Sequence, residues 1–292
     1  MRSIIFILIV ITAVFTFLVV FAWSFQERIA FQPPGQFLPE PDDALRVTYS
    51  AVDNQPLFAY VVGDLKVPRG LLLSFHGNAD LAVRQVEWGR EVVTRTGFTV
   101  MLAEYRGYAG IGGTPGYRAS QLDSEAAYLF AAKELRVPPG RIAFFGHSLG
   151  SAVATELAVR HQPCALLLQS PFTSAQAMAR IIGWPPIDLI WGLISRIHFD
   201  TEADVASLNS PVWVAHGAED RLIPSRMGEQ IFATARIKGE LLIVPRATHN
   251  DVELAGGEIY WQWLSRALIS STLPESASGI VREKPATLSI IR

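Results

Sequence analysis

Gly146-His147-Ser148-Leu149-Gly150 is the stretch of sequence that decides the fold. It follows an apolar run at residues 141–145 and precedes a helical pattern at residues 151–161. A strand, a G-x-S-x-G turn and a helix in this order form a nucleophile elbow. The turn is strained and its backbone passes close to neighbouring elements, so a Cβ at either glycine would clash. Ser148 is therefore the candidate nucleophile.

Such a serine needs two partners, and the chain supplies a candidate for each after the elbow. A hydroxyl is a poor nucleophile until a base takes its proton, and the base needs a carboxylate to hold its tautomer. Asp220 follows the apolar run 211–215, and His249 follows the apolar run 241–244. Active sites of open parallel sheets form outside the carboxyl ends of the strands, so these side chains are expected to meet Ser148 there. The chain order Ser, Asp, His is typical of elbow enzymes.

The chain contains other acidic residues and histidines that could take these roles. Asp251 is an alternative acid, but it stands two residues from His249, a separation better suited to local loop hydrogen bonding. Asp204 and Glu219 are weaker alternatives. The remaining histidines of the motifs, at positions 76, 147 and 216, are interpreted as packing and loop-shaping residues. The six histidines show no H-E-x-x-H or Cys/His ligand spacing, so neither a metal site nor a cofactor is expected.

Four motifs together give a resemblance to a known family. They are His76-Gly77-Asn78, Tyr105-Arg-Gly-Tyr108 with its following glycines, the elbow, and the pair formed by His216-Gly-x-x-Asp220 and His249. On these motifs, from about residue 47 to residue 268, the chain resembles the alpha/beta-hydrolase superfamily. The resemblance is closest to its membrane-anchored serine hydrolases of the abhydrolase-domain type.

The resemblance carries expectations about fold and chemistry. It implies an α/β fold with an eight-stranded, mostly parallel sheet, flanking helices and a small helical cap. It also implies esterase, thioesterase, lipase or peptidase chemistry. By the same resemblance, the backbone amides of Asn78 and Leu149 form an oxyanion hole, the pair of N–H donors that stabilises the alkoxide formed when Ser148 attacks a carbonyl.

The N-terminal segment predicts a membrane span. Residues 4–25 contain no charged side chain, and as a helix these 22 positions would extend for roughly 30 Å, the thickness of a bilayer core. A cleavable signal peptide is the competing interpretation, because Ala22-Trp23-Ser24 fits a small-x-small cleavage site. The apolar stretch is longer than the ~7 to 15 residues usual in such peptides, which favours an anchor. Basic residues flank the span on both sides, Arg2 before it and Arg28 after it, so the positive-inside rule gives only a slight bias in orientation. We expect the N-terminus on the cytoplasmic side and the catalytic domain on the other side.

The composition of the chain indicates one catalytic domain with appendages. We predict an anchor at residues 1–28, a proline-rich and acidic linker at 29–44 that lifts the domain off the membrane, a hydrolase domain at 45–270, and a C-terminal tail at 271–292. An apolar insertion at about 171–209, split by Pro185 and Pro186, resembles a cap. It either packs on the core, lines an acyl pocket or dips into the bilayer. The formal net charge of −2 provides no basic field for a nucleic-acid partner. The single cysteine, Cys164, is interpreted as a buried strand residue.

These observations predict a membrane-anchored serine hydrolase that cleaves an ester or thioester through an acyl-enzyme intermediate. The expected substrate is a small acyl compound, with a lipid-like chain as one case. Two alternatives remain open. A membrane-tethered serine peptidase would need carboxylates near the pocket mouth to bind a free amine. A catalytically silent binding protein of the same fold would have no need of all four motifs.

Overall fold

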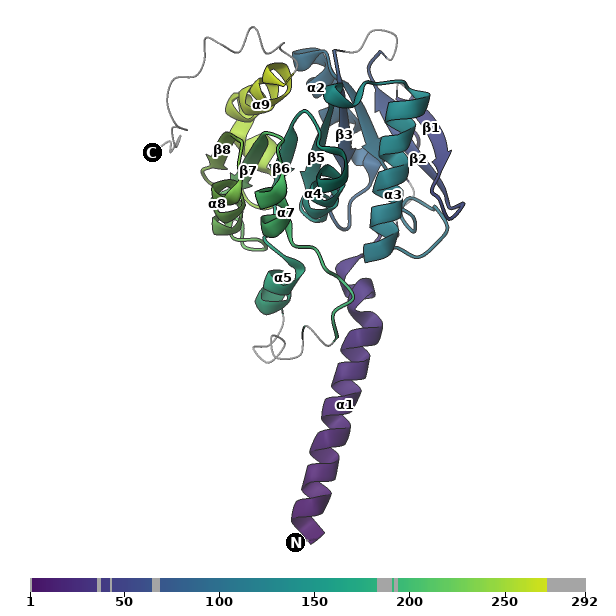
Figure 1. Ribbon diagram of the computed structural model, residues 1–292, viewed down its shortest axis with the longest axis vertical. Helices are drawn as coiled ribbons and strands as arrows, with labels where there is room; N and C mark the ends of the chain where they lie inside the picture. The colour runs from purple at the N-terminus through teal and green to yellow at the C-terminus, as the bar shows by residue number, and fades with distance from the viewer. Residues whose placement is uncertain are drawn as a thin grey trace.

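The computed structural model describes residues 2–35, 38–42, 44–64, 69–182, 191 and 194–271 (Figure 1). Its strands are β1 (Leu45–Ser50), β2 (Pro56–Val62), β3 (Leu71–Phe75), β4 (Thr99–Ala103), β5 (Ile142–His147), β6 (Leu166–Gln169), β7 (Val212–Gly217) and β8 (Lys238–Val244). Its longer helices are α1 (Arg2–Ala30), α2 (Val86–Thr96), α3 (Tyr117–Leu129), α4 (Leu149–His161), α5 (Ala175–Ile182), α7 (Thr201–Ser207), α8 (Ser225–Thr234) and α9 (Val252–Ser270). The predicted insertion falls partly outside the described residues, at 183–190 and 192–193, and the predicted tail does so from residue 272 onwards.

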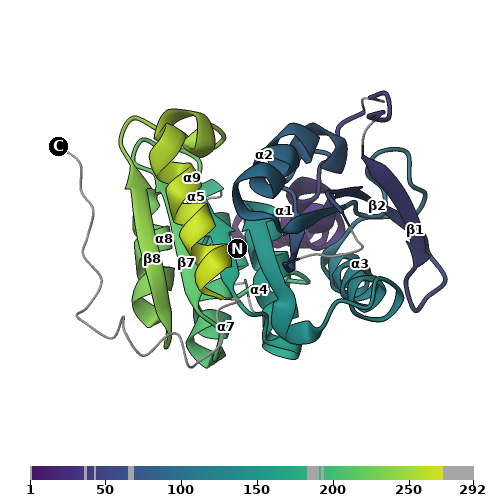
Figure 2. The same cartoon turned by 90° about the horizontal axis from the view of Figure 1, so that it is seen from above.

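The strands form one eight-stranded sheet in the order β1-β2-β4-β3-β5-β6-β7-β8. The pairs β1/β2 and β2/β4 are antiparallel, and the remaining pairs are parallel. The expected alpha/beta-hydrolase fold is confirmed, and β1 and β2 form an antiparallel hairpin at its edge. Parallel strands need crossover connections, and the helices that supply them cover both faces of the sheet (Figure 2).

Side chains that alternate along each strand supply two separate cores. In β3, Leu71, Leu73 and Phe75 face one core, while Leu72 faces the other. Because successive side chains of a strand point to opposite faces, a central strand covered on both sides is apolar throughout. Helices α3, α4, α7 and α8 pack on the first face, and α2 and α9 pack on the second (Figure 2).

Helix α1 projects from this domain as a long rod (Figure 1). The helix Ser3–Ala30 is long and apolar enough to cross a membrane, and no residue of its most apolar stretch is buried in the structure. The helix continues two residues beyond the predicted end of the anchor, to Ala30. Its C-terminal turns contact the domain, where Gln26 hydrogen-bonds to Ile194 and Arg196.

The segment that follows α1 differs from the spacer expected at residues 29–44. Phe31 is 4% exposed and belongs to the first core. The backbone N–H of Gln32 donates to Asn78 Oδ1 at 2.7 Å. An apolar side chain and a backbone donor thus hold the start of this segment against the domain, so it does not act there as an extended spacer.

Cys164 also lies elsewhere than expected. It is half-buried in the turn that precedes β6, and its backbone N–H donates to the carbonyl of Ile142. Burial raises the pKa of its thiol. The apolar run from which its position was inferred starts the strand two residues later, at Leu166.

Candidate active site

The elbow at Ser148 is formed by the junction of β5 and α4. Ser148 adopts φ 53° and ψ −117°, a left-handed conformation that is strained for a residue with a side chain. A Cβ at Gly146 would lie 2.6 Å from the Cα of Ser151, and a Cβ at Gly150 would lie 2.6 Å from the carbonyl oxygen of His76. Both obstacles include backbone that cannot move aside, which explains why the turn needs glycine at these two positions.

Ser148, His249 and Asp220 form a hydrogen-bonded series in which His249 is the middle member. His249 Nδ1 is 2.7 Å from Asp220 Oδ2, and His249 Nε2 is 2.9 Å from Ser148 Oγ. Since a carboxylate only accepts, Nδ1 carries the proton and Nε2 is left to accept from the serine hydroxyl. All three residues are at most 9% exposed. Each comes from the carboxyl end of a different strand, β5, β7 or β8.

Four donors surround the carboxylate of Asp220. Oδ1 accepts from the backbone N–H groups of Leu222 at 2.9 Å and Ile223 at 2.8 Å. Oδ2 accepts from His249 Nδ1, and it also lies 3.2 Å from His216 Nε2, which donates to the carbonyl of Ile223 at 2.8 Å. Burial alone would raise the pKa of Asp220, but the hydrogen bonds from His216, His249 and the Ile223 backbone outweigh it and hold this pKa well below its usual range. Asp220 is therefore ionised and fixed in orientation.

A buried ion pair holds the loop His76-Gly77-Asn78 in place. His76 Nε2 donates to Glu104 Oε1 at 2.7 Å, and Nδ1 donates to the carbonyl of Gly77 at 2.8 Å. Burial by itself would lower the pKa of His76, but Glu104 raises it above its usual value. With both ring nitrogens donating, the imidazole is protonated. Glu104 also accepts from the backbone N–H of Ala82, so it ties the loop to the start of the next helical segment.

The side chain of Asn78 has a structural use, which leaves its backbone amide for other partners. Its Oδ1 accepts from Gln32 N at 2.7 Å, Tyr108 Oη at 3.0 Å and Ala79 N at 3.1 Å. Leu149 is the first residue of α4, and the N–H of such a residue has no acceptor inside the helix. Asn78 and Leu149 both line the cavity that contains Ser148.

The alternative acids lie in other settings. Asp251 Oδ1 accepts from the hydroxyl of Thr248 at 2.9 Å and from its backbone N–H, as expected of a local loop contact. Glu219 is exposed. Asp204 lies on α7, where burial, together with Glu156, raises its pKa to about 6. Among the residues that the structure describes, His249 bonds to the carboxylate of Asp220 and to none of these three.

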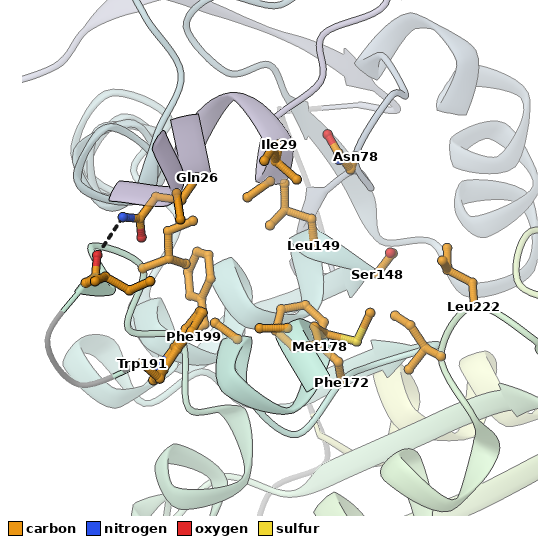
Figure 3. A pocket seen from close by; sticks show the side chains of 17 residues that line it. Gln26, Ile29, Asn78, Ser148, Leu149, Phe172, Met178, Trp191, Phe199 and Leu222 are labelled. Atoms are coloured by element: carbon orange, nitrogen blue, oxygen red, sulfur yellow. Dashed lines mark hydrogen bonds between the residues drawn. The ribbon is translucent and has the colours of Figure 1, made fainter. Parts of the chain in front are cut away.

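An apolar cavity of about 380 Å³ opens beside Ser148 (Figure 3). Cavities of about 300 to 1,000 Å³ are typical of small-molecule sites. Leu149, Phe172, Met178 and Phe199 contribute apolar surface on the side of the domain. The other side comes from α1, whose residues Ala22, Gln26, Ile29 and Ala30 complete the lining. Part of the predicted insertion, namely α5 together with Trp191 and Ile194, therefore lines a pocket.

A second cavity, of about 440 Å³, lies on the side of α2 and α9 and is polar. Asn78 lines both cavities, and His147 and Asn250, the neighbours of Ser148 and His249 in sequence, line the second one. Its charged groups are Asp80, Arg84 and Glu253. Burial, followed by the charge of Glu91, raises the pKa of Glu253.

His147 contributes packing and position in this region. Its Nε2 donates to the carbonyl oxygen of His249 at 3.2 Å, and Ser170 Oγ donates to the same oxygen at 3.2 Å. Burial, and then the neighbouring His249, lowers the pKa of His147 to about 4, so this ring is neutral at pH 7. Together the two donors fix the backbone of His249.

The sequence did not point to Gln26 or Glu104, which both shape the site. It also did not predict that His216 would contact the carboxylate of Asp220. Glu104 directly follows an apolar strand, and an acidic residue at the carboxyl end of such a strand is a signal that could have been used. Gln26 carried no such signal, because its partners lie about 170 residues away in sequence. Among the residues that the structure describes, no group of three or more His, Cys, Asp or Glu side chains could hold a metal ion.

Comparisons with known proteins agree with the fold. Residues 66–198 match the family model described as "Serine aminopeptidase, S33". An uncharacterized protein of Mycobacterium tuberculosis is 31% identical over 261 residues, which cover 87% of this chain and 91% of the relative. Human alpha/beta hydrolase domain-containing protein 17B is 29% identical over 201 residues, covering 68% of this chain and 67% of the relative. An esterase structure from Pyrococcus furiosus superposes with a TM-score of 0.60 at 16% identity, covering 80% of this chain and 95% of the esterase.

Proposed function

Since the chain belongs to the alpha/beta-hydrolase superfamily, we propose that it is a membrane-anchored serine hydrolase that cleaves an ester or thioester. The observation that supports this proposal is the hydrogen-bonded series from Ser148 Oγ through His249 to Asp220. Ser148 lines a cavity large enough for a small ligand.

In the proposed mechanism, Ser148 attacks the substrate carbonyl and His249 Nε2 takes the hydroxyl proton. The carbonyl oxygen becomes an alkoxide and accepts from the backbone N–H groups of Asn78 and Leu149, each contributing ~3 kcal/mol. Asp220 stays ionised and stabilises the imidazolium that forms. Its lowered pKa fits this role, because the carboxylate does not take up the proton.

The second half of the mechanism regenerates the serine. The imidazolium of His249 gives its proton to the leaving oxygen or sulfur, which departs and leaves an acyl-enzyme at Ser148. Water then gives a proton to His249 and attacks the acyl carbonyl. Collapse of the second alkoxide releases the acid and returns the proton to Ser148.

The two cavities indicate what kind of ester fits. A carbonyl carbon carries two substituents, and Asn78 borders an apolar cavity on one side and a polar cavity on the other. An acyl group in the first and a polar leaving group in the second would match both surroundings. We therefore propose an ester that joins an apolar acyl group to a polar alcohol or thiol.

We also propose that α1 remains attached as an anchor and that the catalytic domain lies on the non-cytoplasmic side. Support comes from Ala22 and Trp23, which belong to the small-x-small site of the competing interpretation and would be lost on cleavage after Ser24. Ala22 lines the cavity, and the guanidinium of Arg196 lies 5.1 Å from the Trp23 ring centroid. Mass spectrometry of the mature protein tests retention: a chain that begins after Ser24 would contradict it. Protease accessibility of the domain in sealed cells tests the orientation.

Ester turnover and fluorophosphonate labelling test the catalytic proposal. With the full chain, Ser148→Ala should abolish labelling and lower the turnover of p-nitrophenyl acetate by at least about 10⁴-fold. Ser207→Ala, on an exposed position of α7, is the matched control and should change neither. Turnover by Ser148→Ala near the wild-type rate would contradict the mechanism.

A membrane-tethered peptidase is a second candidate. The name of the matching family model favours it, as do the carboxylates of Asp80 and Glu253 in the polar cavity, which would suit a free amine. Paired assays with p-nitrophenyl acetate and an aminoacyl-p-nitroanilide separate the two functions. Labelling of wild-type protein by the fluorophosphonate separates both from a silent binding protein, which would not react.

A further inference from the structure

The end of α1 forms a wall of the apolar cavity. Ala22, Gln26, Ile29 and Ala30 are spaced by four, three and one residues, which places them on one face of a helix. That face lies across the cavity from Phe172 and Met178 of the domain (Figure 3). A chain that lacked α1 would therefore lack part of the enclosure beside Ser148.

Specific polar contacts hold this wall in place. Gln26 uses both atoms of its amide: Nε2 donates to the carbonyl of Ile194 at 2.7 Å, and Oε1 accepts from the backbone N–H of Arg196 at 2.6 Å. One residue later, Glu27 Oε1 accepts from the backbone N–H of Tyr117 at 3.2 Å. The helix end is thus fastened to two separate parts of the domain, at residues 194–196 and at the start of α3.

The same face of α1 stays apolar as it leaves the domain. Leu18, Phe15 and Ile11 precede Ala22 by four, seven and eleven residues, so they continue the face that lines the cavity. They are 54%, 52% and 59% exposed, within the segment that is apolar enough to cross a bilayer. A continuous apolar surface therefore runs from the lipid-facing part of α1 to the cavity at Ser148.

We propose that the apolar cavity binds one acyl chain of a lipid ester in the surrounding membrane, and that α1 both guides this chain to Ser148 and determines which chain lengths fit. The inference rests on the proposed function, since it places the scissile carbonyl at Ser148. Apolar surface explains the affinity: each buried methylene should raise kcat/KM about fourfold, the equivalent of ~0.8 kcal/mol. The polar side chain of Gln26 is compatible with an acyl chain in the cavity, because its Nε2 and Oε1 are already hydrogen-bonded to the domain.

A pair of substitutions on α1 tests the role of the wall. Ala22→Trp places a large ring on the face that lines the cavity, whereas Ser24→Trp makes a comparable change two residues away, at an exposed position outside the lining. The full chain is reconstituted in phosphatidylcholine vesicles and assayed with p-nitrophenyl acetate and p-nitrophenyl dodecanoate. We expect Ala22→Trp to lower kcat/KM for dodecanoate at least tenfold while acetate turnover changes less than threefold, and Ser24→Trp to change neither.

The opposite wall offers a second pair. Ala179 on α5 lines the cavity, and Gln176 on the same helix does not. Ala179→Trp should repeat the loss for the long chain, and Gln176→Trp should not. Equal behaviour of Ala22→Trp and Ser24→Trp on dodecanoate would overturn the proposal. An equal loss on acetate and dodecanoate would overturn it too, because α1 would then support the serine without selecting the chain.

A tailed probe tests the path of the chain directly. A dodecyl fluorophosphonate that carries a diazirine at the end of its tail would be attached to Ser148 and then photolysed in the vesicles. We expect mass spectrometry to find the cross-link on α1, at or before Ala22. Attachment with cross-links only on other segments would overturn the inference and leave the proposed function standing. Absence of attachment in the wild-type protein would instead contradict the proposed function.

Discussion

Replacing Asp220 with asparagine should invert the direction of the hydrogen bond on which the proposed mechanism depends. In the structure, Asp220 Oδ1 accepts from two backbone N–H groups and Oδ2 accepts from His249 Nδ1. An asparagine that keeps its oxygen towards the two backbone donors must turn its NH₂ group towards His249. The opposite orientation would bring that NH₂ group against two donors, so it is disfavoured.

The magnitude of the loss follows from the tautomer. A donor at the position of Oδ2 makes His249 accept at Nδ1, so the ring proton moves to Nε2, which lies 2.9 Å from Ser148 Oγ. A protonated Nε2 cannot take the serine proton. In a triad of known mechanism the same change lowers kcat by about 10⁴-fold, or about 5.5 kcal/mol of activation free energy. We expect Asp220→Asn to lower kcat for p-nitrophenyl acetate by this amount with KM nearly unchanged.

Asp251→Asn is the matched control, because this carboxylate is close to His249 in sequence and bonds to Thr248. It should keep kcat within about threefold of wild type. Thermal melting checks that both variants remain folded. The reasoning would be refuted if a folded Asp220→Asn protein kept more than a tenth of the wild-type kcat, or if Asp251→Asn caused the larger loss.

Three further predictions concern stability and use chemical denaturation as the measurement. Gly146→Ala should lower the free energy of unfolding by about 1–3 kcal/mol and abolish fluorophosphonate labelling, because the added Cβ meets backbone atoms. Gly140→Ala, where nothing lies within 4 Å of the added Cβ, should lower it by less than about 0.5 kcal/mol, and equal losses would contradict the steric argument. Arg106→Leu removes the guanidinium whose Nη2 lies 2.7 Å from Oδ1 of the buried Asp123, so it should lower the free energy of unfolding by about 3–5 kcal/mol. A loss below about 1 kcal/mol would show that the fold does not need this ion pair. Because the folded-state pKa of His147 is lowered to about 4, the unfolded chain binds a proton that the folded protein does not between pH ~6.5 and pH 4, so the unfolding free energy should fall by up to about 3 kcal/mol as pH drops through this window. His147→Gln should remove that part of the pH dependence, and an unchanged slope would argue against a buried neutral ring.

The fold could be predicted from sequence where local chemistry and chain order carry the information. Gly146 and Gly150 mark the elbow because only glycine tolerates the close backbone approach, and the structure gives the obstacle at each position. Apolar runs located the central strands, since strands covered on both faces carry few polar residues. β5 extends further than the run that predicted it, to His147, because strand pairing with β6 continues through polar side chains.

The parts that could not be predicted depend on contacts between distant segments. Glu104 and His76 are 28 residues apart, and their pairing follows from the adjacency of β3 and β4. The contact of Gln26 with Ile194 spans 168 residues and joins a helix outside the sheet to a distant part of the chain, so no periodic pattern signals it. The start of the expected spacer after α1 differs for the same reason, because the acceptor of Gln32 is on Asn78.

The unbroken course of α1 into the catalytic domain has a kinetic consequence in the proposed topology. Its 29 residues measure roughly 43 Å, more than the ~30 Å of a bilayer core, and no flexible joint separates the lipid-facing part from the part that contacts the domain. The serine would then stay at a constant height above the lipid surface. Turnover should follow the mole fraction of substrate in the enzyme's own bilayer, so diluting the substrate with inert phospholipid should slow the reaction even when the total amount of substrate in the sample is constant.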